Sequence, residues 1–191
     1  MIENLFISNV WFALAAGALV YSVNYYLSIY GAYLYHAGAK DTIVFEGLYV
    51  LTPTLQKAIA ARGFVTTQFL WRLLILSLAI LAAWSLCVVQ FQRPELFSFL
   101  MGGLLLYEAA DFLQDFRTIV LFRYARRAEG LQGKIEYSKR LVLTLSVFEL
   151  YGFAGLYFLM FLVAGSWFFL GGTLTCIVTS RRLRDWVKVR T

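Results

Sequence analysis

Hydrophobic residues dominate five segments of the chain, and short polar stretches separate them. A helix that spans a membrane needs about 20 mainly apolar residues. The five segments lie at about residues 10–33, 67–89, 96–120, 141–164 and 167–180. Gly165-Ser166 and Trp167 divide the last two, which is typical of a turn followed by an interfacial aromatic residue. The pattern predicts an all-α polytopic membrane bundle of five transmembrane helices, with residues 1–191 forming one domain.

The polar stretch between the first two spans carries helix signals of its own. Thr52 and Pro53 are typical of an N-cap and a first helical position, and Gly63 of a helix end. We therefore expect an amphipathic helix at about residues 53–62 that lies on the membrane surface. Residues 121–140 are rich in Lys and Arg and are expected to form a cytoplasmic connector, with the third helix continuing to about Ala128.

The distribution of Lys and Arg predicts the orientation. Of the 17 basic residues, Arg72 falls inside a span, Arg93 lies on one side, and the remaining 15 lie on the other side. Cytoplasmic loops carry the excess of basic residues, so we expect the N-terminus outside and the C-terminus inside. A four-helix topology would place the basic connector and the basic C-terminal segment on opposite sides. The simplest setting is a bacterial inner membrane.

Composition excludes an ordinary soluble protein. The chain is 61% hydrophobic and 15% charged, whereas soluble domains are about 45–50% apolar and about 25% charged. Mean hydropathy is +0.70. We attribute the net charge of +6 to basic loops that face anionic lipids, not to nucleic-acid binding. Cys87 and Cys176 form no CxxC pair, and the expected topology places them too far apart for a disulfide.

Four acidic residues fall inside the apolar segments. Glu108, Asp111 and Asp115 lie on the third span, and Glu149 lies on the fourth. Charged groups in hydrocarbon are costly and usually mark a functional or pairing site. Because the first three are spaced i, i+3 and i+7, we expect them to share one helix face.

Helical rise predicts the depth of these groups. Glu108 lies about 18 Å from the outer end of its span and Glu149 about 12 Å from the inner end of its own, so the two are expected at nearly the same level. Asp111 lies one turn further in. We expect Arg72, Arg117 and Asn24 as polar partners. The acids could become protonated, pair with arginine or bind a cation; the same polar layer could instead fix helix register.

Aromatic and small residues mark two further patterns. Tyr26, Tyr30 and Tyr33 are spaced i, i+4 and i+7 and form either an interfacial aromatic belt or a stacking wall for a quinone, pigment or lipid headgroup. Small residues on three spans predict close helix packing seams. They are Gly102, Gly103, Ala109, Ala110, Gly152, Gly155, Gly171, Gly172, Thr173 and Thr175.

Three functions remain open. The first is a non-enzymatic subunit or scaffold of a larger or homo-oligomeric membrane assembly, which the small-residue seams favour. The second is an oligomeric cation- or proton-translocating protein that uses Glu108, Asp111 and Glu149. The third is a magnesium-dependent lipid enzyme, which rests only on the DxxxD of Asp111 and Asp115. His36 is the one histidine, so bis-histidine haem is excluded. We predict no cofactor, although a lipid or a monovalent or divalent cation could bind.

Overall fold

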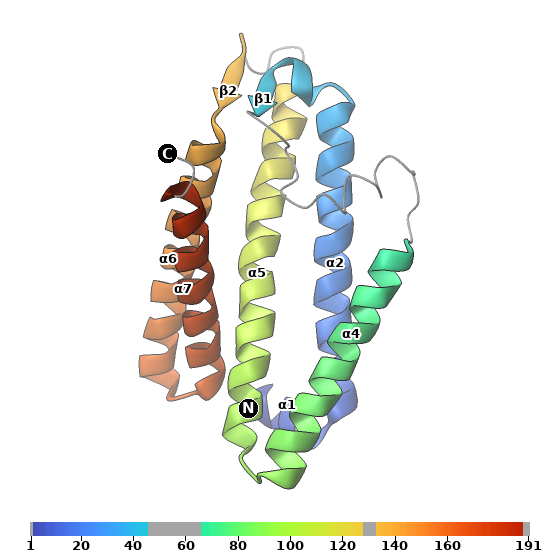
Figure 1. The fold of residues 1–191 in the computed structure, drawn as a ribbon, viewed down its shortest axis with the longest axis vertical. Coiled ribbons are helices and arrows are strands. Elements are labelled where there is room, and N and C mark those ends of the chain that lie inside the picture. The colour runs from blue at the N-terminus through green and yellow to red at the C-terminus, as the bar shows by residue number, and fades with distance from the viewer. Residues whose placement is uncertain (1, 46–65, 128–132, 189–191) are drawn as a thin grey trace.

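The computed structural model describes residues 2–45, 66–127 and 133–188 (Figure 1). The amphipathic helix expected at 53–62 and part of the 121–140 connector lie outside the described residues. The elements are α1 (Ile2–Ser8), α2 (Val10–His36), the 3₁₀ helix η1 (Ala39–Asp41), β1 (Ile43–Phe45), α4 (Thr67–Trp84), the π-helical η2 (Ser85–Gln90), α5 (Pro94–Ala125), β2 (Ile135–Tyr137), α6 (Lys139–Ala164) and α7 (Trp167–Lys188).

In the described part of the chain, four helices are long and apolar enough to cross a membrane, which confirms a predominantly helical membrane protein. They are Val10–His36, Thr67–Gln90, Pro94–Ala125 and Lys139–Ala164. The fifth predicted span coincides with the first part of α7. That helix becomes basic from Arg181 onward and is not among the four. The fifth span therefore stays a prediction.

Local sequence signals explain where the helices begin and end. The side-chain oxygens of Asn9, Thr66 and Ser138 accept backbone N–H groups at the starts of α2, α4 and α6. Pro94 lies in the first turn of α5, where its missing N–H group leaves no hydrogen bond unmade. Gly165 adopts a left-handed φ of 64° and ends α6. The α5 helix stops at Ala125, slightly before the expected Ala128.

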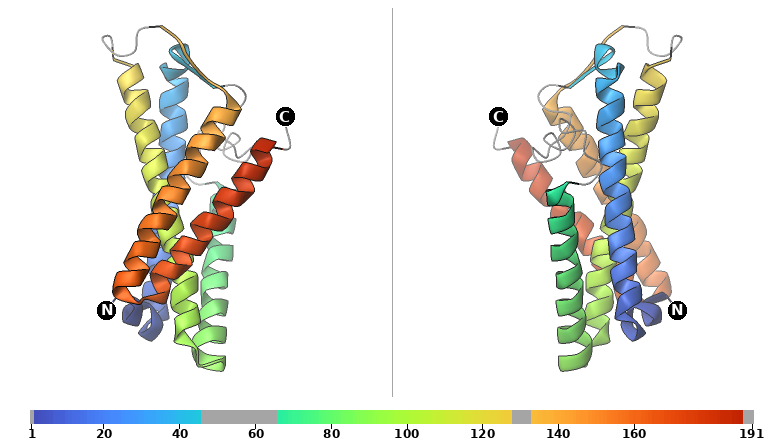
Figure 2. Two further views of the ribbon diagram at one scale, coloured as in Figure 1. Left: turned by 90° about the vertical axis from the view of Figure 1, so that its left-hand side faces the viewer. Right: turned by 90° about the vertical axis from the view of Figure 1, so that its right-hand side faces the viewer.

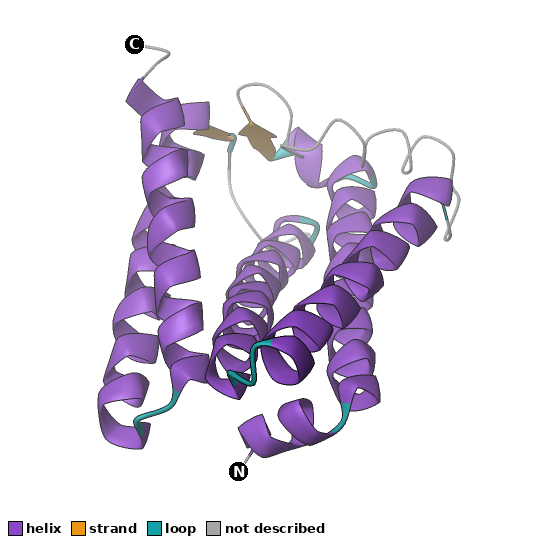
Figure 3. Ribbon diagram, turned by 60° about the horizontal axis from the view of Figure 1, so that its bottom comes forward, coloured by secondary structure: helices purple, strands orange, loops and turns teal. Residues whose placement is uncertain are grey.

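The long helices pack in a sequence of neighbours. The helix α4 packs against α2, α2 against α5, α5 against α7, and α7 against α6 (Figures 1 and 2). The α2, α5 and α7 helices run in one direction, and α4 and α6 run in the other. The two turns that join α4 to α5 and α6 to α7 lie at the same end as α1 (Figure 3). The opposite end carries η1 and the two strands.

Glycines bring α5 and α7 into very close contact. A Cβ atom added at Gly102 would overlap the carbonyl oxygen of Phe168, and one added at Gly171 would overlap that of Phe99. A Cβ at Gly103 would lie 2.7 Å from Thr175 Oγ1. The small-residue faces predicted on the third and fifth segments thus pack against each other, and this contact depends on the absence of side chains there.

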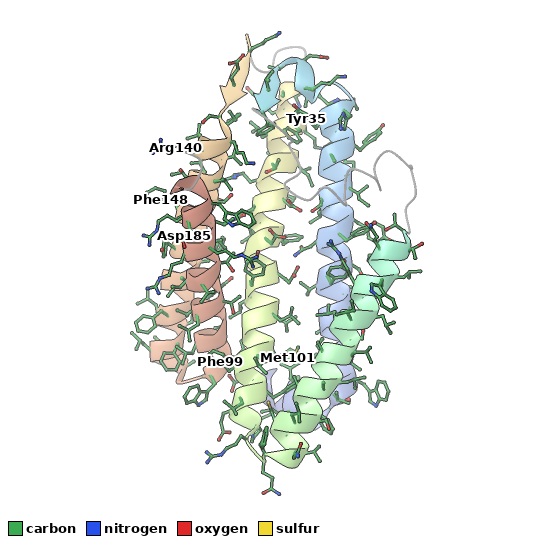
Figure 4. The ribbon with its side chains drawn as sticks, in the orientation of Figure 1. Tyr35, Phe99, Met101, Arg140, Phe148 and Asp185 are labelled. Carbon is green, nitrogen blue, oxygen red and sulfur yellow. The ribbon has the colours of Figure 1, made fainter. Side chains whose placement is uncertain are left out.

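Apolar clusters fill both ends of the α2–α5 pair. Near the α1 end, Phe97 and Met101 of α5 are buried with Ile80 of α4; Met101 is labelled in Figure 4. At the opposite end, Leu34 of α2 is buried with Phe122 of α5. A third cluster joins α5, α6 and α7 around Ala110, Leu150, Tyr157 and Cys176. Cys87 and Cys176 are both free and buried.

A short parallel strand pair was not predicted. Ile43 pairs with Ile135 and Phe45 with Tyr137, which joins the segment after α2 to the segment before α6. The rings of Phe45 and Tyr137 stack with centroids 5.3 Å apart. Each strand has three residues, too few for an alternating pattern to be recognised in sequence.

The glycine contact yields a first prediction. Gly171→Ala should destabilise the protein by about 2 kcal/mol or more, because the new methyl group overlaps backbone that cannot move alone. Thermal unfolding in a mild detergent, together with the yield of monodisperse protein, measures the effect. Gly152→Ala is the matched control, since nothing lies within 4 Å of a Cβ there. Equal unfolding temperatures for the two variants would contradict the prediction.

Candidate functional site

The α2 and α5 helices run parallel, and both repeat their facing residues every seven positions. On α2 the buried positions include Gly17, Asn24 and Gly31. On α5 the matching series is Met101, Glu108, Asp115 and Phe122, of which the first and last are buried. A shared seven-residue repeat keeps two parallel helices in contact over several turns. The polar residues therefore occupy the middle of an otherwise apolar contact.

Two acids of α5 hydrogen-bond to α2. Asn24 Nδ2 donates to Glu108 Oε2 at 2.6 Å and to the Glu108 backbone oxygen at 2.8 Å. Ser28 Oγ donates to Asp115 Oδ2 at 2.5 Å. We call these four residues the polar seam. Asn24 is only 5% exposed, so its contact with Glu108 lies inside the protein and fixes the register of the two helices.

Asp111 lies beside the polar seam without joining it. Its carboxylate interacts electrostatically with Glu108 and Asp115, and Tyr107 is a further neighbour. Among the residues that the structure describes, Asp111 has no hydrogen-bond partner. Its position on α5, one turn beyond Glu108, places it between the face that contacts α2 and the face that contacts α7.

Glu149 is separate from this group, contrary to expectation. It forms an ion pair with Arg117, which joins α6 to α5. Arg117 lies nine residues beyond Glu108, or about 13 Å along the helix. The hydrogen bond from Tyr157 Oη to the Leu106 oxygen, at 2.9 Å, sets the same register. Glu108 and Glu149 were expected at one level on the assumption that all spans begin at equal depth. In the structure, packing shifts α6 along the axis of α5.

Arg72 is linked to the polar seam by its interaction with Tyr21. It lies on α4 and interacts with the Tyr21 side chain of α2, which in turn interacts electrostatically with Glu108. Arg72 was expected as a counter-charge of the acids. In the structure, Arg72 of α4 and Glu108 of α5 both interact electrostatically with Tyr21 of α2.

The three tyrosines of the expected aromatic wall divide into two groups. Tyr26 packs against Phe69 of α4, with ring centroids 5.8 Å apart. Tyr30 and Tyr33 stack on each other at 6.5 Å, and the Arg123 guanidinium lies 5.8 Å from the Tyr30 ring. Tyr33 is 61% exposed. The three rings therefore form no single continuous stacking surface.

Two site residues were missed in the sequence. Ser28 lies four residues after Asn24, and Tyr21 lies three before it, so both share its helix face. A signal existed, because the spacing of Tyr21, Asn24 and Ser28 repeats the i, i+3, i+7 spacing of Glu108, Asp111 and Asp115. Matching the two patterns would have paired the first and third spans.

Within residues 2–45, 66–127 and 133–188, no three His, Cys, Asp or Glu side chains converge into a group that could hold a metal ion. No family model, curated protein or solved structure matches this chain. The function is therefore inferred from the geometry of the described residues.

The polar seam yields a second prediction. Asn24→Leu removes the donor of a buried carboxylate and should cost about 1–3 kcal/mol. Glu108→Met combined with Asn24→Leu should cost about 1 kcal/mol less than the sum of the single changes, since the two side chains bond to each other. Reversible unfolding in mixed micelles measures this double-mutant cycle.

Ser22→Ala is the matched control on the same helix. The Ser22 hydroxyl donates to the Ala18 oxygen within α2, so this change should add independently to Glu108→Met. Strict additivity of Asn24→Leu and Glu108→Met would show that the seam does not couple the helices.

Proposed function

We propose that this protein is a non-enzymatic subunit or scaffold of a membrane assembly. One observation carries the proposal: three of the four acids inside the apolar helices are engaged in contacts between helices. Glu108 bonds to Asn24, Asp115 to Ser28 and Glu149 to Arg117. Cation or proton translocation and magnesium-dependent lipid chemistry would both need several of these carboxylates for a passing ligand. Their use in helix packing favours a structural role.

The outer surface of α6 supports assembly with further helices. Gly152 and Gly155 are open to the outside, with nothing within 4 Å of a Cβ added at either. Large apolar side chains stand above and below them on the same helix; Phe148 is 71% exposed and Val163 is 90% exposed (Phe148 is labelled in Figure 4). A step of small residues between large ones admits the backbone of a neighbouring transmembrane helix. We propose a second copy or another membrane subunit as the neighbour.

We further propose five spans with the N-terminus outside and the C-terminus inside, in a bacterial inner membrane. The apolar part of α7 ends at about residue 180, after about 14 residues or 21 Å. This is shorter than the usual hydrocarbon thickness of about 30 Å, so the basic end of α7 would reach headgroups by extending its long side chains. The Arg182 guanidinium lies 5.7 Å from the Trp186 ring, a pairing suited to the anionic lipid interface.

Topology gives a third prediction. Gln92→Cys, in the exposed turn before α5, should react with a membrane-impermeant maleimide on intact cells. Lys134→Cys, next to β2, should react only after the membrane is opened. The unaltered chain is the background control, because Cys87 and Cys176 are buried. Labelling of Lys134→Cys on intact cells would reverse the proposed orientation.

Assembly gives a fourth prediction, which tests the proposed function. Gly152→Leu together with Gly155→Leu should fill the open step on α6 and lower the mass of the particle extracted in mild detergent. Native mass measurement and cross-linking in membranes report the change. Ala79→Leu adds a bulky apolar side chain at an exposed position of α4 and should leave the mass unaltered. A wild-type particle with the mass of one chain, and no copurifying subunit, would overturn the proposal.

A further inference from the structure

The last turns of α7 carry an exposed basic cluster. Arg181, Arg182 and Arg184 are all exposed, and Asp185 is the one acidic residue that adjoins them in the sequence. Figure 2 shows these turns leaning away from α5, against which the earlier part of α7 packs. This end of the helix therefore presents a net positive charge to its surroundings.

A row of outward-facing side chains leads from the basic cluster back along α7. Leu174, Val178, Arg182 and Trp186 are spaced four residues apart, so they follow one side of the helix. All four are exposed, and Val178 is 63% exposed. The opposite side of α7, which includes Gly171, packs against α5. The outward row thus changes from aliphatic to basic within about one turn.

Arg182 and Trp186 form a pair at the basic end of this row. The Arg182 guanidinium carbon lies 5.7 Å from the centre of the Trp186 ring, and Trp186 is 51% exposed. A guanidinium group that stacks on an aromatic face can still donate its N–H groups, in its own plane, to a phosphate. Exposed tryptophan is typical of the membrane interface, where the lipid phosphates lie.

We propose that this outward face of α7 binds an anionic phospholipid of the inner leaflet. The phosphate contacts Arg181 and Arg182, and an acyl chain lies along Val178 and Leu174. Charge complementarity selects an anionic lipid, because a zwitterionic headgroup brings a cation of its own toward the arginines. Free phosphate would match the arginines alone, whereas a phospholipid matches both the basic and the aliphatic parts of the row.

This inference rests on the proposed function for its topology, because the arginines meet the inner leaflet only if α7 is a fifth span that ends inside. It deepens that proposal by naming a lipid partner and the residues that hold it. A lipid bound to the folded chain stabilises it by mass action. The stability of the chain in detergent therefore reports lipid binding, and this readout depends on neither orientation nor assembly.

The test measures the unfolding temperature of the purified full chain in a nonionic detergent. Phosphatidylglycerol or phosphatidylcholine with the same acyl chains is added, or inorganic phosphate without lipid. Phosphatidylglycerol should raise the unfolding temperature by about 3 °C or more above that in phosphatidylcholine. Arg181→Gln combined with Arg182→Gln should remove at least half of this rise. Both side chains are exposed, so the variant is expected to fold.

Lys139→Gln combined with Arg140→Gln is the matched control. It removes the same charge from exposed positions at the start of α6 (Arg140 is labelled in Figure 4) and should keep the full rise. Three results would overturn the proposal: an equal rise with phosphatidylcholine, an equal rise with inorganic phosphate alone, or equal losses in the two double variants. These results count against the lipid site alone, whereas particle mass and maleimide labelling test the assembly and the orientation of the proposed function.

Discussion

The hydrogen bonds from Asn24 to Glu108 hold the centre of the structure in register. They join α2 to α5, and α5 in turn contacts α7 through glycines that permit no side chain between the backbones. Apolar contacts alone would allow α2 and α5 to slide or rotate, because lipid and apolar side chains solvate each other equally well. A buried amide that bonds to both the side chain and the backbone of one residue permits a single register. The apolar clusters at both ends of the pair then follow from that register.

The remaining polar contacts also join α5 to neighbouring helices. Ser28 repeats the link to Asp115 one heptad further along α5, and Arg117 connects the helix to Glu149 of α6. Glu108, Asp115 and Glu149 thus each meet a side chain of another helix. Among the described residues, Asn24 Oδ1 is one of several buried side-chain atoms without a hydrogen-bond partner, as are Gln114 Nε2 and Glu149 Oε2.

The proposed function rests on one feature of the interior and one of the exterior. In the interior, carboxylates are used for helix packing, which favours a scaffold over a transporter or an enzyme. Outside, Gly152 and Gly155 leave a step on α6 that no residue of the described chain fills. The basic residues at the ends of α5 and α7 suit anionic lipids. The proposed assembly and lipid contacts would both use the outer surface.

The sequence alone determined the four long apolar helices, because hydrophobic length, Pro94 and Gly165 act locally and leave clear patterns. It also predicted Asn24 as a polar partner of the acids, and Asn24 is hydrogen-bonded to Glu108. Only the tertiary structure decided which groups meet, since helix offset and rotation arise from packing between segments far apart in the chain. Glu149 was therefore expected at the level of Glu108, whereas it pairs with Arg117. Ser28 was missed, and the parallel pairing of β1 with β2 left no sequence signal. Depth counted along one helix gives no information about how far its neighbour has shifted.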